Sequence, residues 1–233
     1  MLPVMYRNRF RALLALLALL VVAGCAEGPL WKTGYLSPQV RQRWQDEEQI
    51  AATLFGKRRD MREMVDQAVA AGAAEQQQAA RDLSEIVAGD PVALLRVEAV
   101  QLLNELPGED AAAGLKLATQ DREPSVRRAA VVALGKSGTE QAAGLLASMA
   151  GQDEDEDIRI AAVGALGNTR GPVALAALAE ALKNSNPAMQ MQAAESLARV
   201  TDEDFGADIV AWQDWVDTAV ANRQDPAGST TLR

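Results

Sequence analysis

The feature that most limits how this chain can fold is a segment of about 31 residues that recurs along its second half. Three ten-residue stretches align without a gap, each with arginine third and leucine tenth: 94–103, 125–134 and 157–166. A fourth, weaker copy follows, in which Gln190 replaces the arginine and Leu197 keeps the leucine. A unit of this length buries its apolar face only by stacking on its neighbours, so the period predicts a solenoid.

Each copy has the pattern of a helix, a turn and a second helix. In the second copy, apolar residues recur at helical spacing from Val126 to Leu134, and Gly135 and Gly138 follow. We expect the first helix to end at Gly135 and the second to cover 141–150. Strand-like alternation is absent from the repeats. The expected fold class is all-α, an α-solenoid of about four to five helix-turn-helix repeats.

The segment from Pro124 to Gly135 resembles the HEAT-repeat signature of the bacterial, bilin-lyase-like type. Its Val-Arg, Ala and Ala-Leu-Gly positions all match, and Asp121 stands just upstream. The resemblance covers roughly residues 88–216. It is weaker in the first copy, which has Asn104 where glycine is usual, and in the fourth, as the capping of an array requires.

This resemblance also implies a role for the acidic and basic residues that recur once per repeat. In HEAT arrays such residues form a ladder, in which each arginine pairs with acidic groups of neighbouring units. A catalytic carboxylate is the alternative, but an active-site residue should occur once per protein. The predicted ladder consists of Asp90, Arg96, Asp121, Arg127, Asp153 and Arg159.

An acidic run from Asp153 to Asp157 invites a calcium hypothesis, because calcium prefers oxygen ligands. The run lacks the glycine and the spacing of a calcium loop, and it precedes a predicted helix. Carboxylates there are stabilised by the free N–H groups of the first turn. We therefore expect capping and no metal site.

At the N-terminus, Val22-Ala23-Gly24-Cys25 follows a basic segment and a short apolar run, residues 12–23. That run is too short to span a bilayer and is typical of a secretory signal. The motif resembles the bacterial lipobox, which implies cleavage after residue 24 and a diacylglycerol on Cys25. An ordinary signal or a signal anchor with a free thiol is the alternative. Ala26, where some lipoproteins carry an aspartate that retains them in the inner membrane, slightly favours the outer membrane.

The remaining segments complete the predicted layout. A basic cluster, Lys57 to Arg59, is expected on a solvated helix face, with lipid headgroups as the alternative contact. The expected segments are a signal peptide (1–24), a tether (25–38), an N-terminal helical region or divergent capping repeat (39–88), the HEAT array (89–217) and a disordered tail (218–233).

An aromatic cluster ends the array, since Trp212 and Trp215 fall on one face of the last predicted helix and Phe205 precedes it. The segment from Phe205 to Trp215 resembles a C-terminal sequence found in bacterial HEAT-repeat proteins. We expect a hydrophobic lock that covers the last repeat. A platform that stacks on a ligand is the alternative.

Composition excludes several classes of chemistry. The chain has no histidine and one cysteine, so Cys/His zinc clusters and His-dependent triads cannot form. Its net charge of −9 disfavours nucleic acid as a partner. On these grounds the protein is predicted not to be an enzyme and to hold no cofactor and no metal.

The leading functional hypothesis is a scaffold of the bacterial cell envelope, anchored by its N-terminal lipid, that binds an unidentified protein. By resemblance, the second helix of each repeat lines the concave binding side. The alternative is a chaperone or lyase-like protein that handles a tetrapyrrole or another cofactor. The absence of Phe, Tyr and Trp from residues 90–200 argues against it. A third hypothesis is an envelope structural protein without a discrete partner.

Overall fold

The computed structural model describes the backbone of residues 38–224 and the side chains of residues 49–219. The predicted signal peptide, Cys25 and most of the tether lie outside these residues. The chain divides into two units, residues 1–55 and 56–233, and each is considered by itself. In the first unit the structure describes the start of one long helix, which continues into the second.

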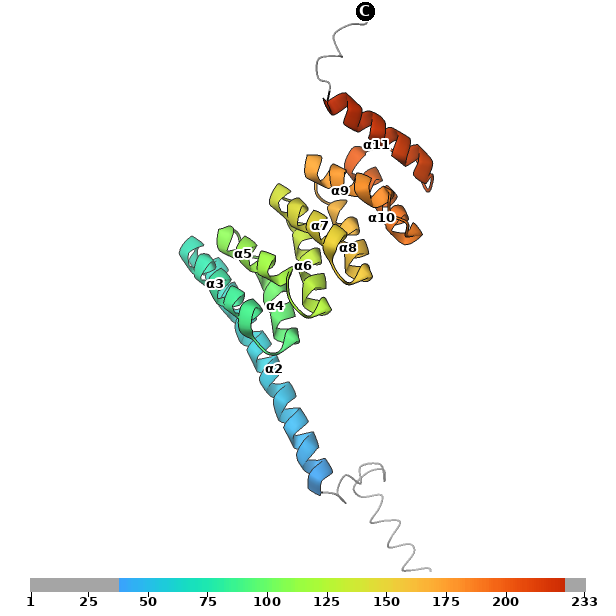
Figure 1. The fold of residues 1–233 in the computed structure, drawn as a ribbon. Helices are drawn as coiled ribbons and strands as arrows, with labels where there is room; N and C mark the ends of the chain where they lie inside the picture. Colours follow the sequence, from blue (N-terminus) through green and yellow to red (C-terminus); the bar gives the residue numbers. More distant parts are fainter. Residues whose placement is uncertain (1–37, 225–233) are drawn as a thin grey trace, which may run out of the picture. The chain divides into compact units, whose positions relative to one another are not determined.

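Within residues 38–224 every regular element is a helix (Figure 1). The helices are α2 (Pro38–Ala71), α3 (Ala73–Gly89), α4 (Ala93–Leu103), α5 (Glu109–Ala118), α6 (Pro124–Ser137), α7 (Glu140–Gln152), α8 (Glu156–Leu166), α9 (Pro172–Leu182), α10 (Pro187–Thr201) and α11 (Ile209–Gln224). This confirms the all-α fold that the repeat predicted.

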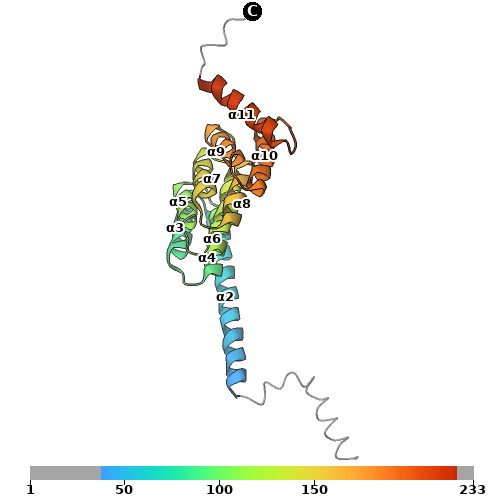
Figure 2. The same ribbon diagram turned by 45° about the vertical axis from the view of Figure 1, so that its right-hand side comes forward.

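The second unit is built from two rows of helices. The first helices of the repeats, α4, α6, α8 and α10, pack on one another in order. The second helices lie beside them, with α3 packed on α5, α7 on α9 and α9 on α11. In Figure 2 the helices α3, α5, α7 and α9 lie to the left of their partners. The unit is a stack of helical pairs, as expected of a solenoid.

The core lies between the two rows and follows the sequence repeat. The leucine that recurs in the first helices is buried in every copy: Leu103, Leu134, Leu166 and Leu197. The leucine of the second helices is buried as well, at Leu83, Leu115, Leu146 and Leu178. Burial of one such side chain stabilises the fold by about 1.5–3 kcal/mol, so these two positions hold the rows together.

The repeated Asp or Asn explains where each first helix begins. Asp90, Asp121 and Asp153 each accept, through Oδ1, the backbone N–H of the residue two positions later, at 2.8–2.9 Å. Asn184 does the same at 2.8 Å. Such Asx turns compete with a continuing helix and direct the chain into a new one. One local device therefore starts α4, α6, α8 and α10.

Two predicted helix ends are wrong. Helix α6 does not end at Gly135 but continues to Ser137, and Gly138 takes the left-handed conformation (φ 61°) that closes it. Gly135 instead lets α6 approach α8, because a Cβ there would lie 3.0 Å from Ala165 Cβ. Helix α11 continues to Gln224, past residue 218, where the disordered tail was expected to begin. Residues 225–233 lie outside the described residues.

Candidate functional site

The predicted ladder residues meet at the turns between repeats. Arg96 donates from Nε and Nη2 to the two carboxylate oxygens of Asp121, at 2.7 and 2.8 Å. Its Nη1 donates to the backbone carbonyl of Asp90 at 2.8 Å. The guanidinium thus joins the turn before its own helix to the turn of the next repeat. Both side chains of the pair are almost fully buried.

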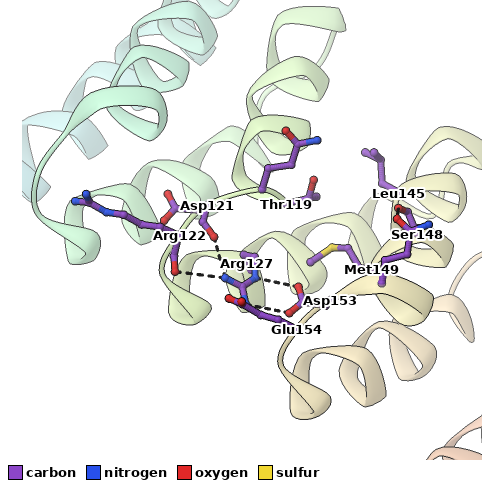
Figure 3. A pocket seen from close by; sticks show the side chains of 11 residues that line it. Thr119, Asp121, Arg122, Arg127, Leu145, Ser148, Met149, Asp153 and Glu154 are labelled. Carbon is purple, nitrogen blue, oxygen red and sulfur yellow. Dashed lines mark hydrogen bonds and ion pairs between the residues drawn. The ribbon is translucent and has the colours of Figure 1, made fainter.

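The same arrangement recurs one repeat later (Figure 3). Arg127 donates from Nε and Nη2 to Asp153, both at 2.9 Å, and from Nη1 to the carbonyl of Asp121, also at 2.9 Å. Glu154 adds a second carboxylate, 3.1 Å from Nη2. Two parallel bonds to one carboxylate fix both orientation and distance. The ladder therefore sets the register between consecutive repeats.

Burial and pairing shift the pKa values of three ladder groups, Arg96, Arg127 and Asp121. A hydrogen bond to Asp121 raises the pKa of Arg96, and a hydrogen bond to Asp153 raises that of Arg127. Burial opposes ionisation of Asp121, but hydrogen bonds from Arg96 and from the Glu123 N–H, with the charges of Arg96 and Arg122, lower its pKa overall. Arg96, Arg127 and Asp121 are thus ionised at neutral pH.

At the third arginine the pattern changes. Arg159 donates from Nη1 to the carbonyl of Asp153 at 2.7 Å, as the other two do in their repeats. Among the described residues, however, no carboxylate accepts two bonds from its other edge. Its Nη2 lies 3.8 Å from Glu156, beyond hydrogen-bond distance. In the repeat that follows Arg159, Asn184 stands at the position that Asp121 and Asp153 occupy after Arg96 and Arg127.

The acidic run is used for capping and pairing. Asp155 caps α8 by accepting the N–H groups of Asp157 and Ile158. Glu156 accepts a bond of 2.6 Å from Asn186 Nδ2. Asp157 lies 3.9 Å from Arg128. In the part of the chain that the structure describes, no group of three or more acidic, Cys or His side chains is placed to hold a metal.

The basic cluster of α2 faces acidic residues of the array and not only solvent. Arg58 lies 2.6 Å from the buried Glu98, and Arg62 lies 2.7 Å from Glu105. Lys57 lies 3.9 Å from Asp90, the first ladder aspartate. These acidic partners were missed in the sequence, although each stands on α4 or just beside it. These pairs join α2 to the first repeat, while the basic side chains remain largely exposed, as a solvated helix face predicts. The lipid contact stays a prediction.

A groove separates α5 from α7, and we call it the α5–α7 groove. Two cavities form it, of about 460 and 320 Å³, and Leu145 lines both. The first cavity lies beside Arg127 and is lined by Thr119, Ser148, Met149 and Gln152 among others (Figure 3). The second is more apolar, with Leu106, Ala112 and Leu115 among its lining residues. The groove thus offers an apolar floor and a polar, charged end.

The size of one residue explains why the second helices separate here. Gly114, Leu145 and Ala177 each precede the buried leucine of a second helix. Gly114 lets α5 approach α3 and α4, because a Cβ there would meet the Ser84 hydroxyl of α3 and would come within 2.7 Å of Leu103 Cδ1 of α4. At the same place in α7 stands the larger Leu145, whose side chain lines both cavities of the groove. The sequence signal that could have predicted the groove is the change from Gly114 to Leu145 at equivalent positions of two repeats.

The predicted terminal residues pack together at the end of the array. Trp212 is fully buried, and its ring centroid lies 4.9 Å from that of Phe205 and 6.1 Å from that of Trp215, both edge to face. Its Nε1 donates to the carbonyl of Gly206 at 3.1 Å. Gln213 reaches the carbonyl of Leu182 at 3.0 Å and so joins α11 to the end of α9.

Comparison with known families identifies the fold. Residues 80–167 and 146–213 match the HEAT repeats family, so more than half of the chain is covered. The protein belongs to the HEAT repeat family. The bilin-lyase-like type and the lipoprotein class are not part of that match. No curated protein matches the sequence.

Several solved structures are weakly similar to this chain. Human deoxyhypusine hydroxylase, solved with glycerol, is 23% identical over 53% of this chain and 44% of its own, with a TM-score of 0.49. A designed armadillo repeat protein in complex with the peptide (KR)4 is 17% identical over 73% of this chain and 85% of its own, with a TM-score of 0.42. The chain thus spans less than half the length of the hydroxylase. These likenesses concern the fold alone.

The prediction that the protein is not an enzyme is corrected by this comparison. An enzyme, deoxyhypusine hydroxylase, is among the matching structures, so an array of helical pairs does not exclude catalysis. The likeness does not establish an activity for this chain. Separately, none of the helices within residues 38–224 is long and apolar enough to cross a membrane.

Proposed function

We propose that this protein is a lipid-anchored scaffold of a bacterial cell envelope, which binds a protein partner in the α5–α7 groove. The observation that carries the proposal is the separation of α5 and α7, whereas α3 packs on α5 and α7 packs on α9. Neighbouring repeats normally bury this surface. Here Leu145 and Leu115 line an opening that a partner's side chains can fill.

The chemistry of the groove favours a protein partner over a flat cofactor. Its floor is aliphatic, and its rim carries hydroxyl and amide groups such as Ser148 and Gln152. Interfaces commonly combine an apolar centre with a polar rim. Tetrapyrrole rings are usually held between aromatic or large apolar side chains, and residues 90–200 contain no aromatic residue. The tetrapyrrole alternative therefore gains no support.

Membrane attachment rests on the sequence at Cys25. Two acyl chains anchor a protein stably, whereas one gives only marginal binding. A bacterial lipobox implies at least a diacylglycerol on the cysteine. The lipid would then keep the array in the envelope, where other envelope proteins can reach its grooves.

The test is crosslinking in intact cells, followed by isolation of the full chain and mass spectrometry. We compare the wild type with Leu145→Asp, which places a charge in the groove, and with Val210→Asp, whose parent side chain on α11 is 66% exposed. The same protein should be recovered with the wild type and Val210→Asp, and at least tenfold less with Leu145→Asp. Equal recovery by both variants, with unchanged melting temperatures, would remove the groove as the binding site.

A further inference from the structure

Arg159 is a ladder arginine with one edge left open. In Arg96 and Arg127, Nη1 binds a backbone carbonyl six residues earlier, and Nε and Nη2 bind a carboxylate of the next repeat. Arg159 keeps the first of these bonds, to the carbonyl of Asp153 at 2.7 Å. Its guanidinium is therefore held by the same tether as in the other two repeats. Among the described residues its Nε has no acceptor.

The residue that should complete this pair is Asn184. Its Oδ1 accepts the N–H of Asn186, as the ladder aspartates do in their turns, but it makes no hydrogen bond with Arg159. An amide carries no negative charge and offers one acceptor oxygen, so it cannot replace a carboxylate that binds both Nε and Nη2. The geometry of the turn is retained, while the pair with a carboxylate of the next repeat is lost, and Glu156 of the same helix lies 3.8 Å from Arg159 Nη2.

A cavity of about 740 Å³ that Arg159 helps to line lies between α7 and α9. Arg159, Lys183 and Asn184 line its polar part, together with Glu180, the one carboxylate in the lining. The rest is mostly small and apolar, with Ala147, Ala150 and Ala177 as examples. The Arg159 side chain is 28% exposed, against 4% and 6% for Arg96 and Arg127. Solvent, and hence a ligand, can reach it.

We propose that the cavity between α7 and α9 binds the carboxylate of an Asp or Glu side chain of the protein partner, which completes the ladder at Arg159. The proposal rests on the proposed function insofar as the carboxylate belongs to a protein. Arg96 and Arg127 supply the template, because the guanidinium at the equivalent position of each of these two repeats binds a carboxylate. Lys183 adds positive charge beside the site, and the alanine-lined wall has room for the backbone that carries the carboxylate.

The site is tested by NMR spectroscopy of the arginine Nε–H groups of the full chain. The probe is N-acetyl-aspartate amide, with N-acetyl-asparagine amide as the uncharged control. The Arg159 signal should shift saturably with the first and not with the second, while the signals of Arg96 and Arg127 stay in place. An Arg159 signal that does not move, or that moves equally with both probes, would overturn the site.

Two variants with the same change of charge sharpen this test. Asn184→Asp supplies the missing carboxylate in cis, so the Arg159 signal should already lie near those of Arg96 and Arg127 and should no longer respond. Asn168→Asp is the matched control, because Asn168 accepts a bond from Arg199 at 3.1 Å and lies outside the cavity. It should respond as the wild type does. An undiminished response of Asn184→Asp would contradict the proposal.

The partner is tested in the crosslinking experiment described above. Asn184→Asp should recover the partner at least tenfold less than Asn168→Asp does. Equal recovery would show that the partner's carboxylate does not use this cavity, and the scaffold function would still stand. If neither the wild type nor any variant recovers a partner, the proposed function fails. The assignment of the carboxylate to a protein then fails with it.

Discussion

Arg127 and Asp153 are joined by two hydrogen bonds of 2.9 Å, although they stand 26 residues apart and belong to consecutive repeats. Both side chains are buried, with 6% and 4% of their surface exposed. Loss of one member leaves the other charged and without a partner. We expect Arg127→Ala to lower the free energy of unfolding by about 3–5 kcal/mol, measured by chemical denaturation.

Arg128→Ala is the matched control for this variant. Arg128 lies 3.9 Å from Asp157, and both side chains are largely exposed. Exposed pairs contribute less than about 1 kcal/mol, so this variant should unfold almost as the wild type does. Arg159→Ala should also cost less than Arg127→Ala, because its guanidinium binds no buried carboxylate in the described residues. Equal losses for all three would show that the ladder does not stabilise the stack.

Stability should fall in acid through Asp121. Its pKa is lowered in the folded protein, against an unfolded value of about 3.9. The stabilisation is therefore complete above the unfolded pKa and is lost as the pH falls through the folded pKa. Denaturation between pH 7 and pH 2 should show a decline below about pH 4. Asp121→Asn should be less stable at pH 7, and its stability should decline less steeply in acid. A decline as steep as that of the wild type would assign the effect to other carboxylates.

Close packing of α5 on α3 depends on Gly114. An added methyl would meet the Ser84 hydroxyl of α3 and would come within 2.7 Å of Cδ1 of the buried Leu103 of α4, so Gly114→Ala should destabilise the protein by about 1–3 kcal/mol. Gly144→Ala on α7 is the control, since its methyl meets nothing within 4 Å. That variant should be stabilised by about 0.5–1 kcal/mol through helix propensity. The opposite order of the two melting temperatures would be incompatible with the packing described.

Trp212 should hold the last repeat in place. Replacement of a buried tryptophan by alanine costs about 3–5 kcal/mol. Stability passes from neighbour to neighbour in a repeat array, so the loss should first appear locally. Hydrogen exchange of Trp212→Ala should rise in residues 187–216 before it rises near Leu103, and Val210→Ala should leave it unchanged. Native exchange together with loss of a bound ligand would favour the stacking platform.

Acylation is predicted at Cys25, outside the described residues. The variant Cys25→Ser cannot accept a diacylglycerol, so it should appear in the soluble fraction or remain as an uncleaved precursor. Fractionation of cells followed by a high-salt wash distinguishes a lipid anchor from an electrostatic contact, which salt weakens. Normal cleavage and retention in the washed membrane would show that the anchor is not this lipid.

The repeat determined the fold class because its information is local. Leucines at helical spacing, a turn every 31 or 32 residues and an Asp or Asn before each first helix are all visible in the chain. These features act over distances of a few residues, through helix periodicity and the Asx turn. Phe205 and Trp212 were likewise placed at the end of the array by sequence order. The alternation between buried and exposed positions followed from the same periodicity.

Only the tertiary structure decided which surfaces remain open. Gly135 reads as a helix stop, but contact with Ala165 places it inside α6. Leu145 directly precedes the core residue Leu146, yet its side chain lines the groove between α5 and α7. Arg159 matches Arg127 in sequence and differs only because a residue 25 positions later is Asn184. Whether two helices touch depends on side-chain volume and charge on another element, and the periodicity of a single segment does not contain that information.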